Sequence, residues 1–486
     1  MINKIKNNSD FVALFLGRLF QAIGAIISIR FMTEILPSEQ IGLQYMINAA
    51  ILWFSLVLVN PFGMFINRYL HQWKVDGELV TRLKSINKYF LLIASLSVGF
   101  FSLNNYFSFF SLNPETQNLN FLAYAFFYLF LSTWYQSLTS FFNILKFQKI
   151  FVFLTNLSQY SGLLIAILLV KNVSNSAHMW LYGLLSGQVF SLCLGLYLFK
   201  KHVVGLDSKP VSQGSVVSIF NKKTLAFCYP LAITTFSIWF LSQGYRFIIE
   251  SLGGLNLIAS LGVGLGIALS CASVVEAIVS QYLYPSYYSS LVANEPSASR
   301  RAWLELWQKC TSIYIPVIFF AVGNAFLILR ILVSEKFLAI ETFVILGFCI
   351  ELLRIMSNVL YISLHGELKT KMSIIPYGTA AVFLLVSLQL LQKFSRFSSN
   401  AVLVALIASQ CIVLFLMFKS ASKNFVDSIS FMPLIKLAAK CLPLLVSIFI
   451  FSETTPIWIL ILYAILAGVY LLLFALPKNL FDALKS

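Results

Sequence analysis

A few ionisable residues stand inside long apolar stretches of this sequence, where a charge needs an opposite charge or water beside it. They are Arg18, Arg246, Glu276, Glu351 and Arg354. Burying such a group in the middle of a bilayer costs at least about 2.5 to 3.5 kcal/mol, so it normally faces a partner or a hydrated cavity. Arg30 and Arg330 lie near the ends of their stretches, where a long basic side chain can also reach the interface.

Two of these stretches place polar residues at helical spacing. Glu351, Arg354 and Asn358 fall on one face of a helix, and Gln243 lies one turn before Arg246 on another. A polar stripe must face something polar. For Glu351 and Arg354 two readings stay open: a role in lining a cavity, or an internal i,i+3 salt bridge that neutralises both charges.

A faint repeat relates two parts of the chain. Residues 30–36 and 246–252 both read Arg-Phe-x-x-Glu-x-Leu, and each copy is followed by a short turn and another apolar stretch. The same offset sets Asn60 opposite Glu276. Asn60 is followed by Pro61, which removes a backbone donor, so we expect a break in the helix there. Internal repeats of this kind are typical of transporters.

The charges inside the apolar stretches are mainly cationic. Arg18, Arg246 and Arg354 outnumber Glu276 and Glu351, and Arg30 adds to the excess if it turns inward. A guanidinium group is always charged and binds phosphate through two parallel hydrogen bonds. The pattern therefore favours a cavity that receives an anionic headgroup, with Asn60, Gln243 and Asn358 as further polar lining.

The elements that carry these residues are predicted to be membrane-spanning helices. The chain has 486 residues, of which 59% are hydrophobic and 11% charged, which excludes a soluble domain. A span needs about 20 mostly apolar residues, and in lipid its backbone must be helical. About fourteen spans are expected: 11–31, 41–66, 89–110, 120–143, 150–170, 178–199, 224–249, 255–282, 310–332, 338–362, 372–392, 400–418, 437–452 and 456–477.

The basic residues predict the orientation of these spans. Of the 34 Lys and Arg residues, 25 fall in the termini and in every second connection, which should be cytoplasmic. Both termini are therefore predicted to be cytoplasmic. The predicted fold class is an all-α polytopic membrane protein with two six-helix bundles, related by a pseudo-twofold axis along the membrane normal, and two additional helices. The expected boundaries are 1–200, a basic linker at 201–223, 224–420 and 421–486.

Several classes of function are excluded or disfavoured by what the sequence lacks. The net charge of +16 follows the orientation pattern, so nucleic acid is not an expected partner. No Walker A motif, protease or hydrolase motif, metal-ligand spacing or disulfide framework is visible. We therefore expect no cofactor, no metal and no catalytic residue. A membrane polymerase or glycosyltransferase would need large outer loops, and the outer connections here are short.

Some segments resemble the bacterial polysaccharide flippases, the O-antigen transporters of the multidrug/oligosaccharidyl-lipid/polysaccharide exporter superfamily. The similar segments are 15–18, 37–42, 60–61, 67–69, 246–249, 253–254 and 281–285. One departure is that many relatives have an acidic residue directly before the arginine of the seventh helix, where this chain has Tyr245.

The resemblance implies two bundles around a cationic cavity that opens alternately to either side of the bacterial cytoplasmic membrane. The implied cargo is an oligosaccharide on a polyprenyl diphosphate carrier, moved to the outer leaflet by an H⁺ or Na⁺ gradient. Arg18, Arg30, Arg246 and Arg354 would then bind cargo, and Glu276 or Glu351 would couple the ion. A polysaccharide polymerase and a chain-length regulator are the implied protein partners.

Three alternatives remain open on the sequence. A drug exporter on the same scaffold should favour an acidic, aromatic cavity for cationic cargo, against which the arginine excess argues. A lipid II exporter differs from the first hypothesis only in its cargo. An enzyme of polysaccharide synthesis is disfavoured by the short outer loops.

Overall fold

The computed structural model is all-helical throughout the residues that it describes, which are 2–107, 119–204, 222–291, 296–366, 370–394, 398–422, 432–452 and 455–476. The predicted fold class, an all-α polytopic membrane protein, is confirmed. Most of the predicted linker at 201–223 and the end of the chain lie outside the described residues.

Eleven helical stretches in the described residues are long and apolar enough to cross a membrane. One of them, Thr224–Tyr284, holds two of the predicted spans, 224–249 and 255–282. The predicted spans 120–143 and 338–362 are also helical, although they are not among those eleven. Within the part of the chain that the structure describes, each predicted span therefore falls mostly on helix.

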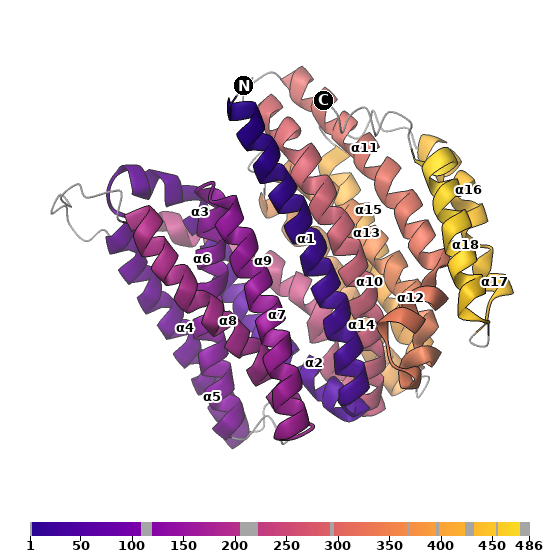
Figure 1. The fold of residues 1–486 in the computed structure, drawn as a ribbon, viewed down its shortest axis with the longest axis horizontal. Coiled ribbons are helices and arrows are strands. Elements are labelled where there is room, and N and C mark those ends of the chain that lie inside the picture. The colour runs from indigo at the N-terminus through magenta and orange to yellow at the C-terminus, as the bar shows by residue number, and fades with distance from the viewer. Residues whose placement is uncertain are drawn as a thin grey trace. The chain divides into compact units, whose positions relative to one another are not determined.

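The helices form two compact units (Figure 1). The first unit comprises Met1–Ser28 and Ile35–Asn256, and the second comprises Ile29–Glu34 and Leu257–Ser486. The helices of the first unit are α1 (Ile2–Ile35), α2 (Ser38–Phe54), α3 (Asn60–Val75), α4 (Leu79–Phe107), α5 (Leu119–Phe127), α6 (Thr133–Ile144), α7 (Gln148–Asn172), α8 (Ala177–Phe199) and α9 (Lys222–Trp239). The boundary between 200 and 224, which we placed from the sequence repeat, stays a prediction. In the packing of the helices, α9 belongs to the first unit, where it contacts α3.

The second unit contains the longer helices of the C-terminal half. They are most of α10 (Arg246–Leu291), then α11 (Pro296–Gly323), α12 (Ala325–Leu332), α13 (Glu341–Gly366), α14 (Ile374–Lys393), α15 (Ser399–Ser422), α16 (Met432–Cys441), α17 (Ser447–Ile450) and α18 (Ile457–Tyr470). The C-terminal helices, yellow in Figure 1, pack on this unit, with α16 against α11 and α18 against α12. The expected pair of additional helices is thus present as α16–α17 and α18.

The first unit is held together by close helix contacts and aromatic residues. A Cβ on Gly187 would come within 2.3 Å of the backbone of Gly162, and one on Gly183 within 2.2 Å of that of Ala166. These small residues, spaced four apart on α7 and α8, let the two backbones approach closely, which is the usual way that helices associate in lipid. Elsewhere in this unit the buried Phe141 and Phe142 belong to an apolar cluster with Leu154 of α7 and Leu192 of α8.

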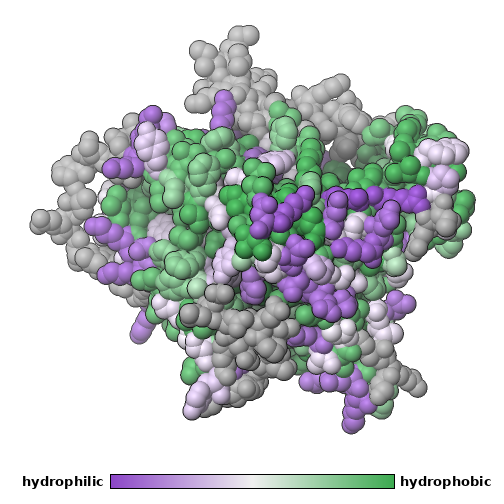
Figure 2. Space-filling model, turned by 60° about the horizontal axis from the view of Figure 1, so that its bottom comes forward, coloured by the Kyte–Doolittle hydropathy of each residue, from purple (hydrophilic) through white to green (hydrophobic). Residues whose placement is uncertain are grey.

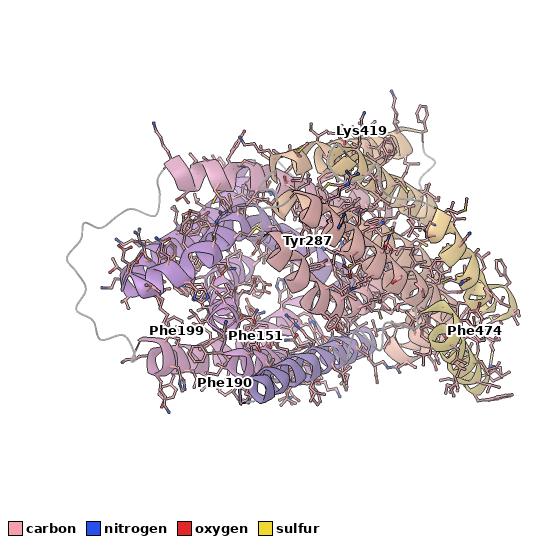
Figure 3. The ribbon with its side chains drawn as sticks, turned by 90° about the horizontal axis from the view of Figure 1, so that it is seen from above. Phe151, Phe190, Phe199, Tyr287, Lys419 and Phe474 are labelled. Carbon is pink, nitrogen blue, oxygen red and sulfur yellow. The ribbon has the colours of Figure 1, made fainter. Side chains whose placement is uncertain are left out.

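Large apolar side chains cover the outer surface of the helices. Phe190 on α8 and Phe474 after α18 are 56% and 64% exposed, and both are labelled in Figure 3. Figure 2 shows hydrophobic residues over much of the visible face, with hydrophilic residues gathered in patches. Such surfaces are stable in lipid and would aggregate in water.

The helix around Asn60 corrects one prediction. We expected a backbone break at Asn60–Pro61, but the helix runs unbroken from Ser38 to Val75. A single π-helical turn, η1 (Ser55–Val59), precedes Asn60, and Pro61 occupies the first turn of α3. A π turn absorbs an irregularity without ending the helix, and the hydroxyl of Tyr89 donates to the carbonyl of Leu58 at 2.8 Å within it.

The predicted boundary between the spans 224–249 and 255–282 is a sharp kink at Gly254. Its φ is 69° and its ψ is −176°, a conformation that is essentially restricted to glycine. The chain passes from the first unit to the second two residues later. Glycine at this position therefore lets two helices follow each other without a loop.

Candidate functional site

Two of the predicted acidic residues and one arginine form a hydrogen-bonded cluster in the second unit. Arg354 donates from Nε to Glu351 Oε2 at 2.7 Å and from Nη2 to Glu276 Oε2 at 2.9 Å. Asn358 Nδ2 donates to the other oxygen of Glu276 at 2.8 Å. The cluster joins α10 to α13, and in it Arg354 and Asn358 contact the carboxylate of Glu276.

The cluster lies in a partly buried place and carries a net negative charge. The side chains of Glu351, Glu276 and Arg354 are 10%, 20% and 28% exposed. Two carboxylates around one guanidinium give a formal charge of −1 when both are ionised. This arrangement favours the salt-bridge reading of Arg354 over a free, cargo-facing guanidinium, and it extends the predicted i,i+3 pair by a second ion pair to another helix.

Tyrosines lie near Glu276 on its own helix and on two further helices. Tyr284 on α10, Tyr314 on α11 and Tyr377 on α14 all interact electrostatically with Glu276. Their hydroxyl groups supply polar neighbours that remain neutral at ordinary pH. The site is thus an acidic centre with tyrosine around it, which suits a proton or a small cation better than an anion.

Arg246 in the first unit has a different environment. Its side chain is buried, at 5% exposure, and its guanidinium lies 5.0 Å from the centre of the Tyr45 ring. Nη1 donates to Gln243 Oε1 and, at 3.4 Å, to the carbonyl of Tyr45. Within the described residues no carboxylate pairs with Arg246, and its Nε has no acceptor. The charge is therefore balanced only by dipoles and an aromatic face.

A second π turn positions this arginine. η5 (Phe240–Gly244) separates α9 from α10 and widens the turn between Trp239 and Arg246. Gln243 and Arg246 stay neighbours, as predicted, while Trp239 Nε1 donates to the carbonyl of Ala49 at 2.8 Å and ties the segment to α2. π turns are found frequently at functional sites because they reorient a side chain locally.

Arg18, like Arg246, has no acidic partner among the described residues. Its Nη1 donates to Gln21 Oε1 at 2.9 Å, its guanidinium lies 5.3 Å from the centre of the Phe151 ring, and its Nε has no acceptor. The surrounding stretch of α1 is held by α7. There Gln159 and Tyr160 donate to the carbonyls of Gln21 and Phe20 at 2.9 and 2.7 Å.

Arg30 behaves differently from Arg18 on the same helix. It pairs with Glu34 at 3.7 Å and donates to the carbonyl of Val333. This agrees with the alternative of a structural role near the helix end. Asn60 begins α3 in a half-buried position, and its role in lining a cavity stays a prediction. Arg330 donates to the carbonyl of Thr455, so it also ties helix ends together.

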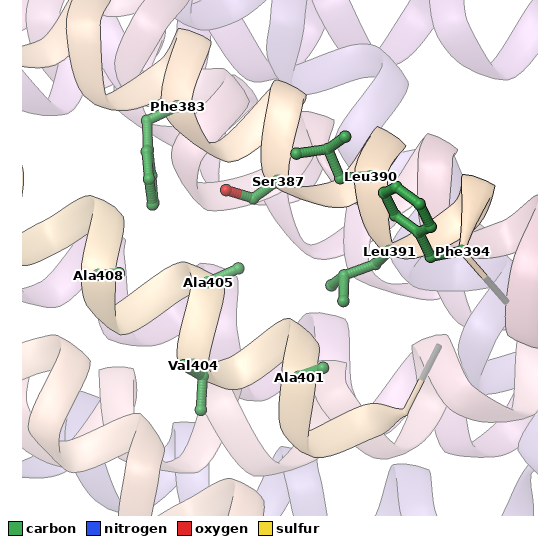
Figure 4. A pocket seen from close by; sticks show the side chains of 9 residues that line it. All are labelled: Phe383, Ser387, Leu390, Leu391, Phe394, Ala401, Val404, Ala405 and Ala408. Atoms are coloured by element: carbon green, nitrogen blue, oxygen red, sulfur yellow. The ribbon is translucent and has the colours of Figure 1, made fainter. Parts of the chain in front are cut away.

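The second unit also has an apolar groove of about 520 Å³ between α14 and α15 (Figure 4). Phe383, Leu390, Leu391 and Phe394 line one side, and Ser387 is the polar group among the lining residues. A groove without charge cannot receive a headgroup. In a bilayer it would be filled by hydrocarbon chains.

Sequence reasoning missed the aromatic partners of the arginines. Tyr45 and Phe151 lie on α2 and α7, far from Arg246 and Arg18 in the chain. In a chain with 21 Tyr and 46 Phe, no local pattern singles them out. The described residues contain no group of three His, Cys, Asp or Glu side chains that could hold a metal ion.

The comparisons with known proteins identify a fold. No family model matches the sequence, and no curated protein matches it. The lipid II flippase MurJ in an inward closed conformation is similar with a TM-score of 0.70 and 14% identity, covering 98% of this chain and 99% of that chain. The eukaryotic MATE transporter AtDTX14 is similar with a TM-score of 0.57 and 14% identity, covering 86% of this chain and 96% of that chain.

A third similar structure is a transporter of the MOP superfamily from Pyrococcus furiosus, described as having a binding pocket of reverse polarity. Its TM-score is 0.54 at 11% identity, and the likeness covers 85% of this chain and 93% of that chain. The chain therefore has the fold of MurJ and MATE transporters of the MOP superfamily, and it is a multi-pass membrane protein. These similar structures are transporters rather than enzymes.

Proposed function

We propose that this protein is a flippase for oligosaccharides linked to polyprenyl diphosphate, the carriers of O-antigen and related surface polysaccharides. The observation that carries the proposal is the state of Arg18 and Arg246. Each lies within a membrane-spanning helix without a carboxylate partner among the described residues, and each has an Nε without an acceptor. A lone guanidinium in this setting is costly, and a diphosphate would satisfy it.

The chemistry of the cargo fits these two arginines. A diphosphate presents several charged oxygens, and a guanidinium group binds them through paired hydrogen bonds with fixed geometry. Gln243, which already accepts a hydrogen bond from Arg246, keeps that side chain oriented. The sugars would meet polar and aromatic side chains, and the polyprenyl tail would stay in the lipid.

The coverage of the similar structures favours a lipid-linked cargo over a soluble drug. The lipid II flippase covers 98% of this chain, whereas the MATE transporter AtDTX14 covers 86%. A lipid II exporter is accordingly the second candidate, since lipid II also presents a polyprenyl diphosphate. The arginines in the first unit do not favour cationic drugs, which would be repelled.

The acidic cluster supports ion coupling. When Glu276 and Glu351 are both ionised, Arg354 is held between them. Proton binding to Glu276 would release one ion pair, and a bound Na⁺ would compete with Arg354 for the same oxygens. Each event changes the contact between α10 and α13, so an H⁺ or Na⁺ gradient could drive the transport cycle. We assign coupling to this cluster rather than cargo binding.

The proposed orientation in the membrane rests on the charge pattern of the sequence. We place the protein in the cytoplasmic membrane of a bacterium with both termini in the cytoplasm. A polysaccharide polymerase and a chain-length regulator would act on the product at the outer face, and they are the proposed protein partners.

Purified protein in vesicles tests the proposal directly. A lipid-linked oligosaccharide is placed in one leaflet, and its transfer is followed by a sugar-modifying reagent that cannot cross the membrane. We expect Arg246→Ala and Arg18→Ala to reduce the transfer rate by about 10- to 100-fold, since each removes a charge-assisted contact worth about 1.5 to 3 kcal/mol. Arg246→Lys should retain part of the rate, because it keeps the charge but loses the paired hydrogen bonds.

Arg82→Ala provides a matched control. Arg82 pairs with Glu78 at 2.7 Å, so its loss should leave the transfer rate unchanged. Transfer at the full rate in both Arg18→Ala and Arg246→Ala would reject their role in cargo binding. Loss of transfer in Arg82→Ala as well would mean that any lost arginine damages the protein.

A further inference from the structure

A second groove in the second unit lies between α11 and α16, and it differs from the apolar groove in its charge. Its volume is about 470 Å³. Lys436 and Lys440 line it from α16, and Trp307 and Gln308 line it from α11. No carboxylate is among the lining residues. The groove is therefore a basic site that the proposed transport function does not use.

Four hydrogen-bond donors in this groove lack acceptors among the described residues. The indole Nε1 of Trp307 has no hydrogen-bond acceptor, and the residue is buried at 2% exposure. Gln308 and the two lysines are exposed, and none of them donates to a described residue. The nearby Lys309 is different, because it is paired with Glu305 at 2.6 Å. Two lysines that line one groove without a carboxylate partner among the described residues favour an anionic ligand.

The spacing of the lysines strengthens this conclusion. Lys436 and Lys440 are four residues apart on α16, so their ammonium groups lie on one helix face and repel each other. The hydroxyl of Tyr470 donates to the carbonyl of Lys440 at 2.7 Å and fixes that end of α16. A bound anion would turn this repulsion into attraction to both groups.

The apolar lining residues of the groove indicate the kind of molecule to which the anionic group would belong. Leu304, Leu434 and Leu437 line the same groove, so an apolar chain must lie beside the charged group. By the charge pattern of the sequence, residues 283–309 and 419–436 are cytoplasmic connections and Lys440 lies at the cytoplasmic start of the next span. Both lysines of the groove are therefore expected at the level of the inner headgroups. Basic pockets between helices on this side of a membrane recognise anionic lipid headgroups.

We propose that the groove between α11 and α16 binds an anionic phospholipid of the inner leaflet. Its phosphate lies between Lys436 and Lys440, beside the amide of Gln308, while an acyl chain follows the leucines. The bound lipid would hold α16 against α11. The site is separate from the proposed cargo contacts at Arg18 and Arg246 in the first unit.

Native mass spectrometry of the delipidated protein tests this proposal by titration with phosphatidylglycerol and, separately, with phosphatidylcholine. We expect phosphatidylglycerol to bind the unaltered protein more tightly. The double variant Lys436→Gln/Lys440→Gln should bind it about 30-fold more weakly, the equivalent of about 2 kcal/mol for two basic residues near an anionic headgroup. Either single variant should lose about 5-fold, which provides the test if the double variant does not fold.

A matched control removes the same charge elsewhere. Lys88→Gln/Lys371→Gln takes two exposed lysines from outside the groove and should leave the affinity for phosphatidylglycerol unchanged. Equal affinities of the unaltered protein for the two lipids, or an unchanged affinity in the groove variants, would overturn the proposal. So would an equal loss in the control, because net charge alone would then explain the binding.

Two competitors separate the sources of a phosphate. Inorganic phosphate should not displace phosphatidylglycerol, because it lacks the acyl chain. Displacement of phosphatidylglycerol by inorganic phosphate would refute the proposal that the ligand is a lipid. Preferential displacement by polyprenyl diphosphate would assign the groove to the cargo and refute the phospholipid, while leaving the transfer experiment on Arg18 and Arg246 unaffected.

Discussion

The arginines inside the membrane-spanning helices fall into two groups according to their partners. Arg354 and Arg30 pair with carboxylates, whereas Arg18 and Arg246 rest on aromatic rings and amide oxygens. The sequence predicts which residues are out of place in lipid, because charge and hydropathy are local properties. It also suggests the local pair of Glu351 and Arg354 as one alternative. It cannot predict the pair of Glu276 and Arg354, because these two residues meet only when α10 packs against α13.

Arg354→Ala should destabilise the protein. Glu276 and Glu351 would lose their common partner in a partly buried place, and breaking a buried pair in this way costs about 3 kcal/mol. We expect a clear loss of unfolding free energy in detergent, measured by thermal or chemical unfolding. Adding Glu276→Gln should recover part of the loss, since one carboxylate is then neutral. Equal stability of Arg354→Ala and the unaltered protein would show that the ion pairs contribute little.

Glu276→Gln should uncouple transport from a pH gradient. The amide cannot take up a proton, so acidification can no longer break the contact with Arg354. Glu351, Asn358 and the neighbouring tyrosines Tyr284, Tyr314 and Tyr377 stay in place. Transfer in vesicles should then proceed at one rate with or without the gradient. Glu305→Gln, which alters an exposed pair with Lys309, is the control and should keep the dependence. A persistent dependence in Glu276→Gln would exclude that residue from proton coupling.

At the scale of the helix, irregular turns and small residues place the functional side chains. The kink at Gly254 falls where the sequence predicts a boundary, because two glycines interrupt the apolar run. The π turns η1 and η5 were not predictable, since the residues of 55–59 and 240–244 carry no distinctive pattern. The predicted break at Pro61 is wrong for another reason. A proline in the first turn of a helix costs little, because the backbone donor that it lacks is not needed there.

Gly187→Ala should weaken the contact between α7 and α8. The new Cβ would lie 2.3 Å from the backbone of Gly162, where no flexible side chain can move aside. We expect a loss of about 1 to 3 kcal/mol in unfolding free energy, as for other overpacked sites. Gly378→Ala on α14, where nothing lies within 4 Å, should be neutral or slightly stabilising because alanine favours helix. Similar stabilities for the two variants would contradict the close approach.

At the scale of the whole molecule, the amino-acid composition predicts most of the architecture. An apolar content of 59% leaves helices in lipid as the available architecture, and the described residues of each predicted span are mostly helical. What composition cannot decide is the cargo, because the similar structures share the fold at 11 to 14% identity. The cargo depends on a few side chains, and their surroundings follow from tertiary packing.

The orientation of the chain can be tested with two engineered cysteines in a variant free of the seven natural ones. Val75, the last residue of α3, and Val173, directly after α7, are 83% and 63% exposed and should lie on opposite sides of the membrane. In intact cells a membrane-impermeant thiol reagent should label Val173→Cys and spare Val75→Cys. Labelling of Val75→Cys alone would reverse the predicted orientation.

The most direct test of the central claim is the choice of cargo. Vesicles with the purified protein are given a polyprenyl-diphosphate-linked oligosaccharide and a cationic drug together, and the movement of each is followed separately. We predict that the lipid-linked oligosaccharide changes leaflets, that the drug does not accumulate, and that Arg246→Ala slows the movement of the oligosaccharide by about 10- to 100-fold. Accumulation of the drug without movement of the oligosaccharide would contradict the proposed function.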